Sequence, residues 1–183
     1  MKLFAIAIIL LQPFQVCMAE NLMNKKENPS SLQTVAYVDL IRYTGVWHQI
    51  ALIPNFFQKN CTINTTATYT LMKNGQVEVI NACSKENGKR KSIRGSAKVV
   101  DPLSQAKLGV RFFWFQPRAP YWIIELDSEY TYAVVGTPNR KYLWILSRTP
   151  SMDKKTYVHL LDRARAQGFD THSIKLTAPI NED

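Results

Sequence analysis

The sequence predicts an all-β fold: an eight-stranded antiparallel up-and-down β-barrel with one C-terminal α-helix packed outside it. Three observations carry this prediction. Strand-like segments follow one another between residues 47 and 147, turn residues separate them, and a helical period begins only after residue 150. Sequential strands with short connections favour an antiparallel meander, and closing the meander into a barrel removes its exposed edges.

Turn signals set the strand boundaries. Pro54 and Pro102 end strands, Asn74-Gly75 is a strong hairpin signal, and Pro138 lies in the turn before the last strand. The expected strands cover residues 47–53, 62–71, 76–82, 92–100, 107–115, 121–126, 130–135 and 141–147.

The segment before the first strand is expected to close one end of the domain. Residues 35–41 predict a short turn or a one-turn helix. Gly45 stands two residues before Trp47, and glycine adopts backbone angles that other residues avoid. A tight bend at Gly45 would deliver the large Trp47 ring into the core, where tryptophan usually finds a partner for its N–H.

A single amphipathic helix follows the eighth strand. Ser151 is the expected N-cap, with Asp153 in the first turn, and Gly168 is the expected C-cap. Residues 169–177 are expected to run back as a short ninth strand, and the tail 178–183 to be loose. The apolar stripe of the helix has the spacing i, i+3, i+4, i+7 and comprises Tyr157, Leu160, Leu161 and Ala164.

The N-terminus reads as an export signal over residues 1–19. Lys2 precedes an apolar run over residues 3–11 that is too short to span a bilayer, and Ala19 offers a small residue at the cleavage point. A bacterial lipoprotein signal is the alternative, with lipidated Cys17 as the new N-terminus. The residues just before Cys17 are not small, which favours release into the periplasm or outside over anchoring to the outer membrane.

After such a signal, residues 20–34 form a polar, flexible leader, and residues 35–177 form the barrel domain. Cys61 and Cys83 remain, and an even count in an exported protein indicates a disulfide. The predicted hairpin brings Cys61 and Cys83 into one neighbourhood. Two buried free thiols, or a bridge made elsewhere, remain alternatives.

Composition excludes several classes of function. The formal net charge is +9, which favours anionic partners, but the basic residues are scattered and no nucleic-acid motif accompanies the run 89–91. No catalytic motif, phosphate-binding loop or metal-ligand cluster is present, and His48, His159 and His172 are far apart in the sequence. We therefore expect no enzyme activity, no cofactor and no metal.

Three stretches carry a resemblance to a known family. They are Gly45-x-Trp47, Asp127 with the run 130–136, and the run 144–150. With the helix and the eight strands, the chain resembles the lipocalins over about residues 37–176, and within them the bacterial lipocalin and apolipoprotein D branch. The resemblance implies a calyx whose end is closed by Arg148 lying across Trp47, a structural pair.

An eight-stranded barrel of this kind encloses one small ligand. Strand alternation with Trp47 inward also places Gln49 and Ala51 inward, and Ile50 and Leu52 outward. The pocket is expected to be aromatic and apolar, and its ligand-binding side chains are Tyr69, Phe112, Trp114, Trp122, Tyr132 and Trp144.

These observations predict an exported carrier of a small hydrophobic ligand. Fatty acid or lysophospholipid, bound for membrane maintenance at the bacterial envelope, is the most concrete form. A lipocalin-fold enzyme acting on a lipid-like substrate and a secreted scavenger are the alternatives. Phe56-Phe57 on a mouth loop suits either peripheral membrane contact or a homodimer. The mouth loops are expected at residues 55–60, 85–91 and 116–120, with Lys59, Arg90 and Arg118 as cations.

Overall fold

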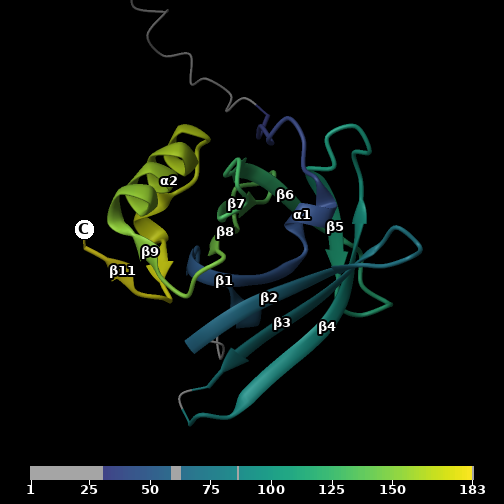
Figure 1. Cartoon of the computed structure of the whole chain (residues 1–183), viewed down its shortest axis with the longest axis horizontal. Coiled ribbons are helices and arrows are strands. Elements are labelled where there is room, and N and C mark those ends of the chain that lie inside the picture. The colour runs from purple at the N-terminus through teal and green to yellow at the C-terminus, as the bar shows by residue number, and fades with distance from the viewer. Residues whose placement is uncertain (1–30, 59–62, 86, 183) are drawn as a thin grey trace, which may run out of the picture. The chain divides into compact units, whose positions relative to one another are not determined.

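Eight strands close into one antiparallel barrel, which confirms the predicted fold class (Figure 1). Each strand pairs with the next along the chain, and β1 also pairs with β8 to close the ring. The strands are β1 Gly45–Leu52, β2 Ile63–Leu71, β3 Val77–Ser84, β4 Arg90–Val99, β5 Lys107–Arg111, β6 Ala119–Leu126, β7 Tyr132–Gly136 and β8 Leu143–Ser147.

The computed structural model describes residues 31–58, 63–85 and 87–182. The predicted signal peptide, Cys17, most of the leader, Lys59 and Cys61 lie outside the described residues. Within them, no helix is long and apolar enough to cross a membrane.

Buried side chains form two clusters, one on each face of the barrel wall. The inner cluster fills the barrel around Trp47 and Tyr69. The outer cluster lies between the wall and the helix α2, Lys154–Ala166, and includes Ile145 and Leu160. Both faces of several strands are therefore buried, which for an antiparallel sheet is the less common arrangement.

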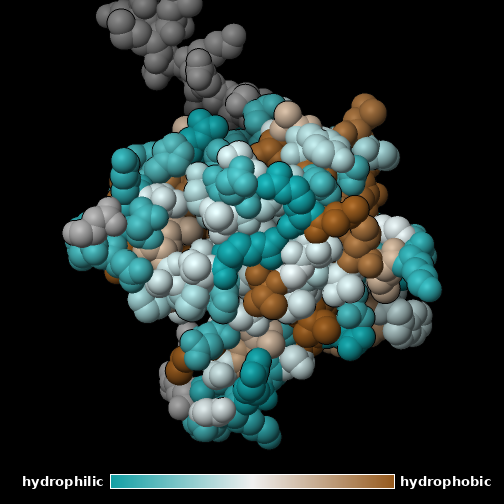
Figure 2. Space-filling model, viewed as in Figure 1, coloured by the Kyte–Doolittle hydropathy of each residue, from teal (hydrophilic) through white to brown (hydrophobic). Residues whose placement is uncertain are grey.

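Helix α2 begins two residues later than the sequence predicts. Its N-cap is Asp153, whose carboxylate accepts a hydrogen bond of 2.7 Å from the backbone N–H of Thr156, so the expected N-cap at Ser151 is wrong. That bond lowers the pKa of Asp153. Gly168 follows the C-cap with φ +84°, as a helix-ending glycine does. Leu160 and the other buried members of the stripe face the barrel, and the outward surface of α2 is largely hydrophilic in Figure 2.

The predicted short helix before β1 is α1, Leu40–Tyr43. Asp39 caps it by accepting a 2.8 Å hydrogen bond from the N–H of Ile41. The chain is already packed before this point: Leu32 is 4% exposed, and the N–H of Val35 donates to Ile123 O. The last residues assigned to the leader therefore lie against the barrel.

A β-bulge in β1 reverses part of the expected alternation. The pairing of β1 with β8 shifts between Gln49 and Ala51, and Ala51 then pairs with Ile145 of the outer cluster. The inward position expected for Ala51 is wrong, because one extra residue moves every later side chain to the opposite face. Leu52 pairs with Trp144 of the inner face, so the outward position expected for Leu52 is wrong as well.

The chain after α2 is ordered, so the loose tail expected from residue 178 is wrong. Beyond the 3-10 helix η3, Thr171–Ser173, strand β10, Lys175–Leu176, pairs with Ala51 and Leu52 of β1. Strand β11, Ile180–Asn181, pairs in parallel with β9, Met152–Asp153. β10 is the expected ninth strand, and it joins β1 beyond His48, where the pairing of β1 with β2 ends.

Strand β5 ends at Arg111, four residues before the predicted end. Val110 pairs with Ala119, so the chain must turn between them, and the N–H of Gln116 donates to Phe113 O inside that turn. The aromatic run after Phe112 has strand propensity but no neighbouring strand to pair with, and it forms the β5–β6 loop.

Candidate functional site

The barrel has a closed end and an open end. α1 and the loops 72–76, 100–106 and 127–131 lie at the closed end, where β1 begins. Because the strands alternate in direction, the other connections gather at the open end, and in the described residues these are 53–58, 85 with 87–89, 112–118 and 137–142.

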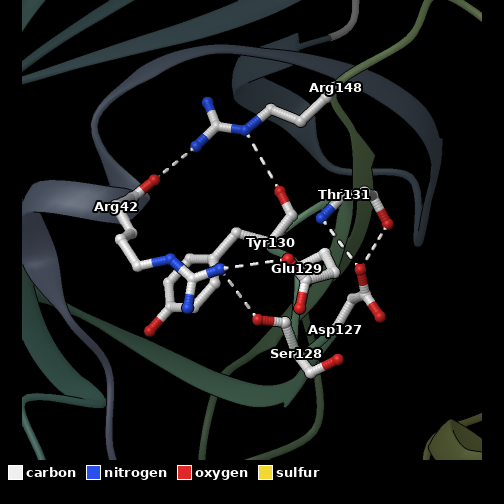
Figure 3. Close-up of polar contacts among 7 residues, drawn as sticks. All are labelled: Arg42, Asp127, Ser128, Glu129, Tyr130, Thr131 and Arg148. Atoms are coloured by element: carbon white, nitrogen blue, oxygen red, sulfur yellow. Dashed lines mark hydrogen bonds and ion pairs between the residues drawn. The ribbon is translucent and has the colours of Figure 1, made fainter.

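Arg148 ties the closed end together (Figure 3). Its guanidinium donates to Arg42 O at 2.7 Å, to Val46 O at 3.0 Å and to Tyr130 O at 3.2 Å. It also lies 3.9 Å from the centre of the Trp47 ring, as the resemblance implies. One cation thus joins α1, β1 and the β6–β7 loop, and burial lowers the pKa of Arg148.

Gly45 makes this contact possible. Its φ is +97°, and a Cβ placed on it would come within 3.2 Å of Nη1 of Arg148. Trp47 is fully buried, and its Nε1 donates to Tyr43 O at 2.9 Å. The Gly-x-Trp pattern therefore reflects a backbone turn, a close approach by Arg148 and an anchored ring.

The β6–β7 loop is held from both sides (Figure 3). Arg42 donates to Ser128 O at 2.9 Å and lies 4.2 Å from the centre of the Tyr130 ring. Asp127 accepts a 2.6 Å hydrogen bond from the hydroxyl of Thr131, which lowers the pKa of Asp127. These contacts make the closed end a rigid base, so access to the interior must come from the open end.

Three tyrosine hydroxyls meet above this base. The hydroxyl of Tyr121 lies 2.8 Å from that of Tyr43 and 2.8 Å from that of Tyr69. Burial raises the pKa of all three, that of Tyr69 to about 12. A cavity of about 10 Å³ adjoins them, room for about one water. The floor of the cup is therefore apolar with a neutral hydrogen-bonding group at its centre.

The tyrosine cluster should make the free energy of unfolding depend on pH in the alkaline range. We expect the free energy of unfolding to fall as the pH rises from about 10 to about 12. An unfolded tyrosine loses its proton near pH 10, whereas folded Tyr69 keeps it until about pH 12, so the unfolded state binds fewer protons in this window and is favoured. For Tyr69 alone the loss is on the order of 3 kcal/mol at the upper end.

Urea unfolding at a series of pH values, with tyrosinate absorbance followed in parallel, measures this effect. The Tyr69→Phe variant should show a weaker pH dependence, because one of the three buried tyrosines whose pKa is raised is gone. Ionisation of every tyrosine in one step near pH 10, with the protein still folded, would contradict the raised pKa values.

The open end has its own polar contacts. Gln58, in the 3-10 helix η2 Phe56–Gln58, accepts from Nε1 of Trp144 at 2.8 Å and donates to Oε1 of Gln49 at 2.9 Å. Gln49 in turn donates to the hydroxyl of Thr177 at 3.2 Å. Alternation along β1 places Gln49 inward, but no sequence signal identifies Gln58, because a loop residue has no periodic pattern to place it.

Only half of the predicted ligand-binding residues lie on the inner face. Tyr69 belongs to the inner cluster, and Phe112 and Trp144 pack against it. Trp122 and Tyr132 pack in the outer cluster instead, so their expected place in the pocket is wrong. Trp114 is 84% exposed in the β5–β6 loop and does not line the interior either.

Strand pairing explains why Trp122 and Tyr132 face outward. Trp122 pairs with Gly136 and with Lys107, whose ammonium lies 4.8 Å from the centre of the Trp122 ring. Tyr132 pairs with Ser147, one residue beyond Leu146 of the inner cluster.

Two further residues shape the interior and were missed from the sequence. A Cβ on Gly95 would come within 2.7 Å of the Phe112 ring, so the glycine lets that ring lie against β4. Thr65 lies on the same face of β2 as Ala67, and its buried hydroxyl has no hydrogen-bond partner among the described residues. It offers a hydrogen bond near the open end.

No other chemistry-bearing cluster is found in the described part of the chain. No three of its His, Cys, Asp and Glu side chains are grouped to hold a metal ion. Cys83 is 2% exposed on β3, and the Cys61–Cys83 disulfide stays a prediction because Cys61 is outside the described residues.

Comparisons with known proteins give a consistent result. A family model described as a lipocalin-like domain matches residues 38–179. Temperature-induced lipocalin-1 of Arabidopsis thaliana is 40% identical over 153 residues, 80% of this chain and 82% of that protein. Bovine apolipoprotein D is 35% identical over 150 residues, 78% of each chain. Outer membrane lipoprotein Blc of Vibrio cholerae is 33% identical over 148 residues, 80% of this chain and 85% of that one.

Solved structures agree with the fold. Insecticyanin from the tobacco hornworm Manduca sexta superposes with a TM-score of 0.63 at 19% identity, covering 82% of this chain and 90% of that one. The cockroach allergen Per a 4 gives a TM-score of 0.61 at 17% identity, covering 83% of this chain and 96% of that one.

Proposed function

Because this chain belongs to the lipocalin family, whose members bind small hydrophobic ligands, we propose that it carries a fatty acid or a lysophospholipid in its barrel, without a chemical step. One observation carries the proposal. The buried side chains of the inner face are apolar or aromatic, and the buried polar groups beside them are neutral: tyrosine hydroxyls, a threonine hydroxyl and a glutamine amide. Such an interior suits an apolar chain with a polar end.

The position of the polar groups supports an extended ligand. Trp144 and Phe112 are the partly buried aromatic side chains of the inner face toward the open end, while the tyrosine hydroxyls lie at the floor. An acyl chain can lie along the rings, and its head group stays near the open end, where water and cationic side chains are available.

A hydrolytic or isomerising activity is the competing function. The tyrosine cluster is the group that such a reaction would use. Burial raises the pKa of its members, so at neutral pH they are protonated hydrogen-bonding groups and poor proton acceptors. This favours binding over catalysis.

Export is part of the same proposal. It rests on Lys2, the apolar run 3–11 and Ala19, with Cys17 as the alternative lipid anchor. The name of one relative supports a location outside the cytoplasm, since it is an outer membrane lipoprotein. The proposed setting is the bacterial envelope.

Two tryptophan variants test the proposed site. Trp144→Ala should weaken binding of a fluorescent fatty acid or of a lysophospholipid about tenfold or more, because it removes a large apolar contact at the ligand. Trp122→Ala is the matched control: it also removes a partly buried tryptophan, but from the outer face, and should leave affinity within about twofold.

Isothermal titration calorimetry measures both variants, and thermal unfolding establishes that each is folded. Equal affinity in Trp144→Ala and wild type would contradict the site. Native mass spectrometry of protein from its own host would identify the carried molecule, and a substrate turned over by the protein would contradict a pure carrier.

A further inference from the structure

Three aromatic side chains project from the β5–β6 loop at the open end. Phe113, Trp114 and Phe115 are 45%, 84% and 66% exposed. Their rings contact one another, with centroids 5.6 Å apart for Phe113 and Phe115 and 5.9 Å apart for Trp114 and Phe115. Together these three residues form what we call the aromatic rim, and Phe56, 80% exposed, lies on another loop of the same end. Water-exposed aromatic clusters of this kind usually mark an interaction site.

The two ends of the barrel differ in the sign of most of their charged side chains. The described residues of the open-end loops include cations and no carboxylate: Lys85, Lys89, Arg118, Arg140 and Lys141. The neighbouring strand ends add Arg90, Lys91 and Arg111. The closed end, in contrast, carries the acidic residues Asp39, Asp101, Asp127 and Glu129 beside the cations Arg42, Lys73 and Arg148. Among the described residues, the end that carries the aromatic rim is therefore more positively charged than the closed end.

The charge decides between two exposed apolar surfaces. At the closed end Ile41 is 72% exposed and Leu103 is 91% exposed, so exposure alone does not distinguish that end from the rim. Ile41 follows Asp39 by two residues, however, and Leu103 follows Asp101 by two. An anionic surface would therefore attract the open end more strongly than the closed end.

We propose that the open end docks on the surface of an anionic lipid bilayer. The aromatic rim enters the head-group region, where tryptophan and other aromatic rings are favoured, and the surrounding lysines and arginines lie over the phosphates. The mouth of the barrel then faces the bilayer. This docking goes beyond the proposed ligand binding, because it depends on the outer surface of the open end and not on the cup.

A second copy of the chain fits this surface less well. A twofold dimer through the aromatic rim would place the same basic side chains of two molecules against each other, which costs electrostatic energy. A bilayer containing acidic phospholipid supplies apolar depth and negative charge together, which is what the rim and its surroundings present.

Vesicle co-sedimentation with the full chain tests the proposal. The wild-type protein should bind vesicles of phosphatidylcholine and phosphatidylglycerol, bind pure phosphatidylcholine vesicles more weakly, and lose binding as salt is added. Trp114→Ser with Phe115→Ser should weaken binding about tenfold or more, because two large apolar side chains no longer enter the interface. Any contribution of the apolar run 3–11 is the same in all variants.

Two control variants at the closed end are matched to changes at the open end, one for apolar exposure and one for charge. Leu103→Ser removes a side chain at least as exposed as Trp114 and should leave vesicle binding unchanged. Lys141→Glu should weaken binding about tenfold, since each basic residue near an anionic surface adds about fivefold in affinity and the variant also adds a repelled charge. Lys73→Glu makes the same change of charge at the closed end and should have a smaller effect.

Three results would overturn the proposal. They are unchanged vesicle binding by the rim variant, an equal loss in Leu103→Ser, and rim-dependent dimerisation measured by analytical ultracentrifugation without vesicle binding. Ligand titration of the rim variant in solution separates this proposal from the proposed function. Retained affinity for the fatty-acid probe, together with lost vesicle binding, means that docking and the cup are distinct.

Discussion

Replacing Trp47 with alanine is expected to lower the free energy of unfolding by about 3–5 kcal/mol, the range for a fully buried large aromatic residue. The Trp47 ring is completely buried, 5.0 Å from the Tyr43 ring and 3.9 Å from the guanidinium of Arg148. Truncation would leave a cavity at the base and remove the surface on which Arg148 lies. Urea unfolding followed by circular dichroism gives the change directly.

The exposed Trp114 provides the control for that measurement. Trp114→Ala removes an identical side chain that is 84% exposed, and the free energy of unfolding should change by no more than about 0.5 kcal/mol. If the Trp47 and Trp114 variants were equally stable, the closed end would not be the anchored base described here. A Trp47→Phe variant should lie between them, because it keeps a ring in the site but loses the N–H bond to Tyr43.

Replacing Tyr121 with phenylalanine is the second large effect, and its size depends on position within the tyrosine cluster. Tyr121 is the central member, so its loss leaves the buried hydroxyls of both Tyr43 and Tyr69 without their described partner. Each unsatisfied buried hydroxyl costs about 1–3 kcal/mol, and we expect about 2–4 kcal/mol in total.

The variant Tyr69→Phe tests whether the central position of Tyr121 sets the size of the effect. It makes the same chemical change but leaves Tyr121 paired with Tyr43, so the expected cost is about 1 kcal/mol. Thermal or urea unfolding of the two variants compares them at constant side-chain volume. An equal cost for Tyr121→Phe and Tyr69→Phe would show that the hydroxyls do not act as a chain through Tyr121.

The barrel could be predicted from the sequence because its signals are local. Asn74-Gly75 requires a tight turn, and the change of hydrophobic period after residue 150 distinguishes the helix from the strands. The contact between Arg148 and Trp47 came from the family resemblance. Nothing in the spacing of two residues so far apart along the chain predicts it.

The faces of individual strands could not be predicted in the same way. On β6 both Tyr121 and Ile123, which face inward, and Trp122 and Ile124, which belong to the outer cluster, are apolar. Alternation between two apolar sets does not say which of them is inside. In β1 the bulge after Gln49 adds one residue to the count, and the sequence contains no glycine there to announce it.

The aromatic run 112–115 misled for a different reason. Phenylalanine and tryptophan favour strands when a neighbouring strand and a covered face are available. A prediction from propensity alone takes both conditions to be met. Phe112 finds them against β4, whereas the next three residues have no strand partner and face solvent. Tertiary context therefore sets the end of β5, and the resulting exposure could be recognised only in the folded chain.

Because β10 pairs with β1, the C-terminal segment adds one more short strand to the barrel wall. Where β1 no longer pairs with β2, Leu176 and Lys175 take up the vacant edge, and the hydroxyl of Thr177 contacts both the backbone and the side chain of Gln49. The C-terminal segment therefore forms part of the barrel wall, and truncation before Lys175 would leave the edge of β1 at Ala51 and Leu52 without this partner.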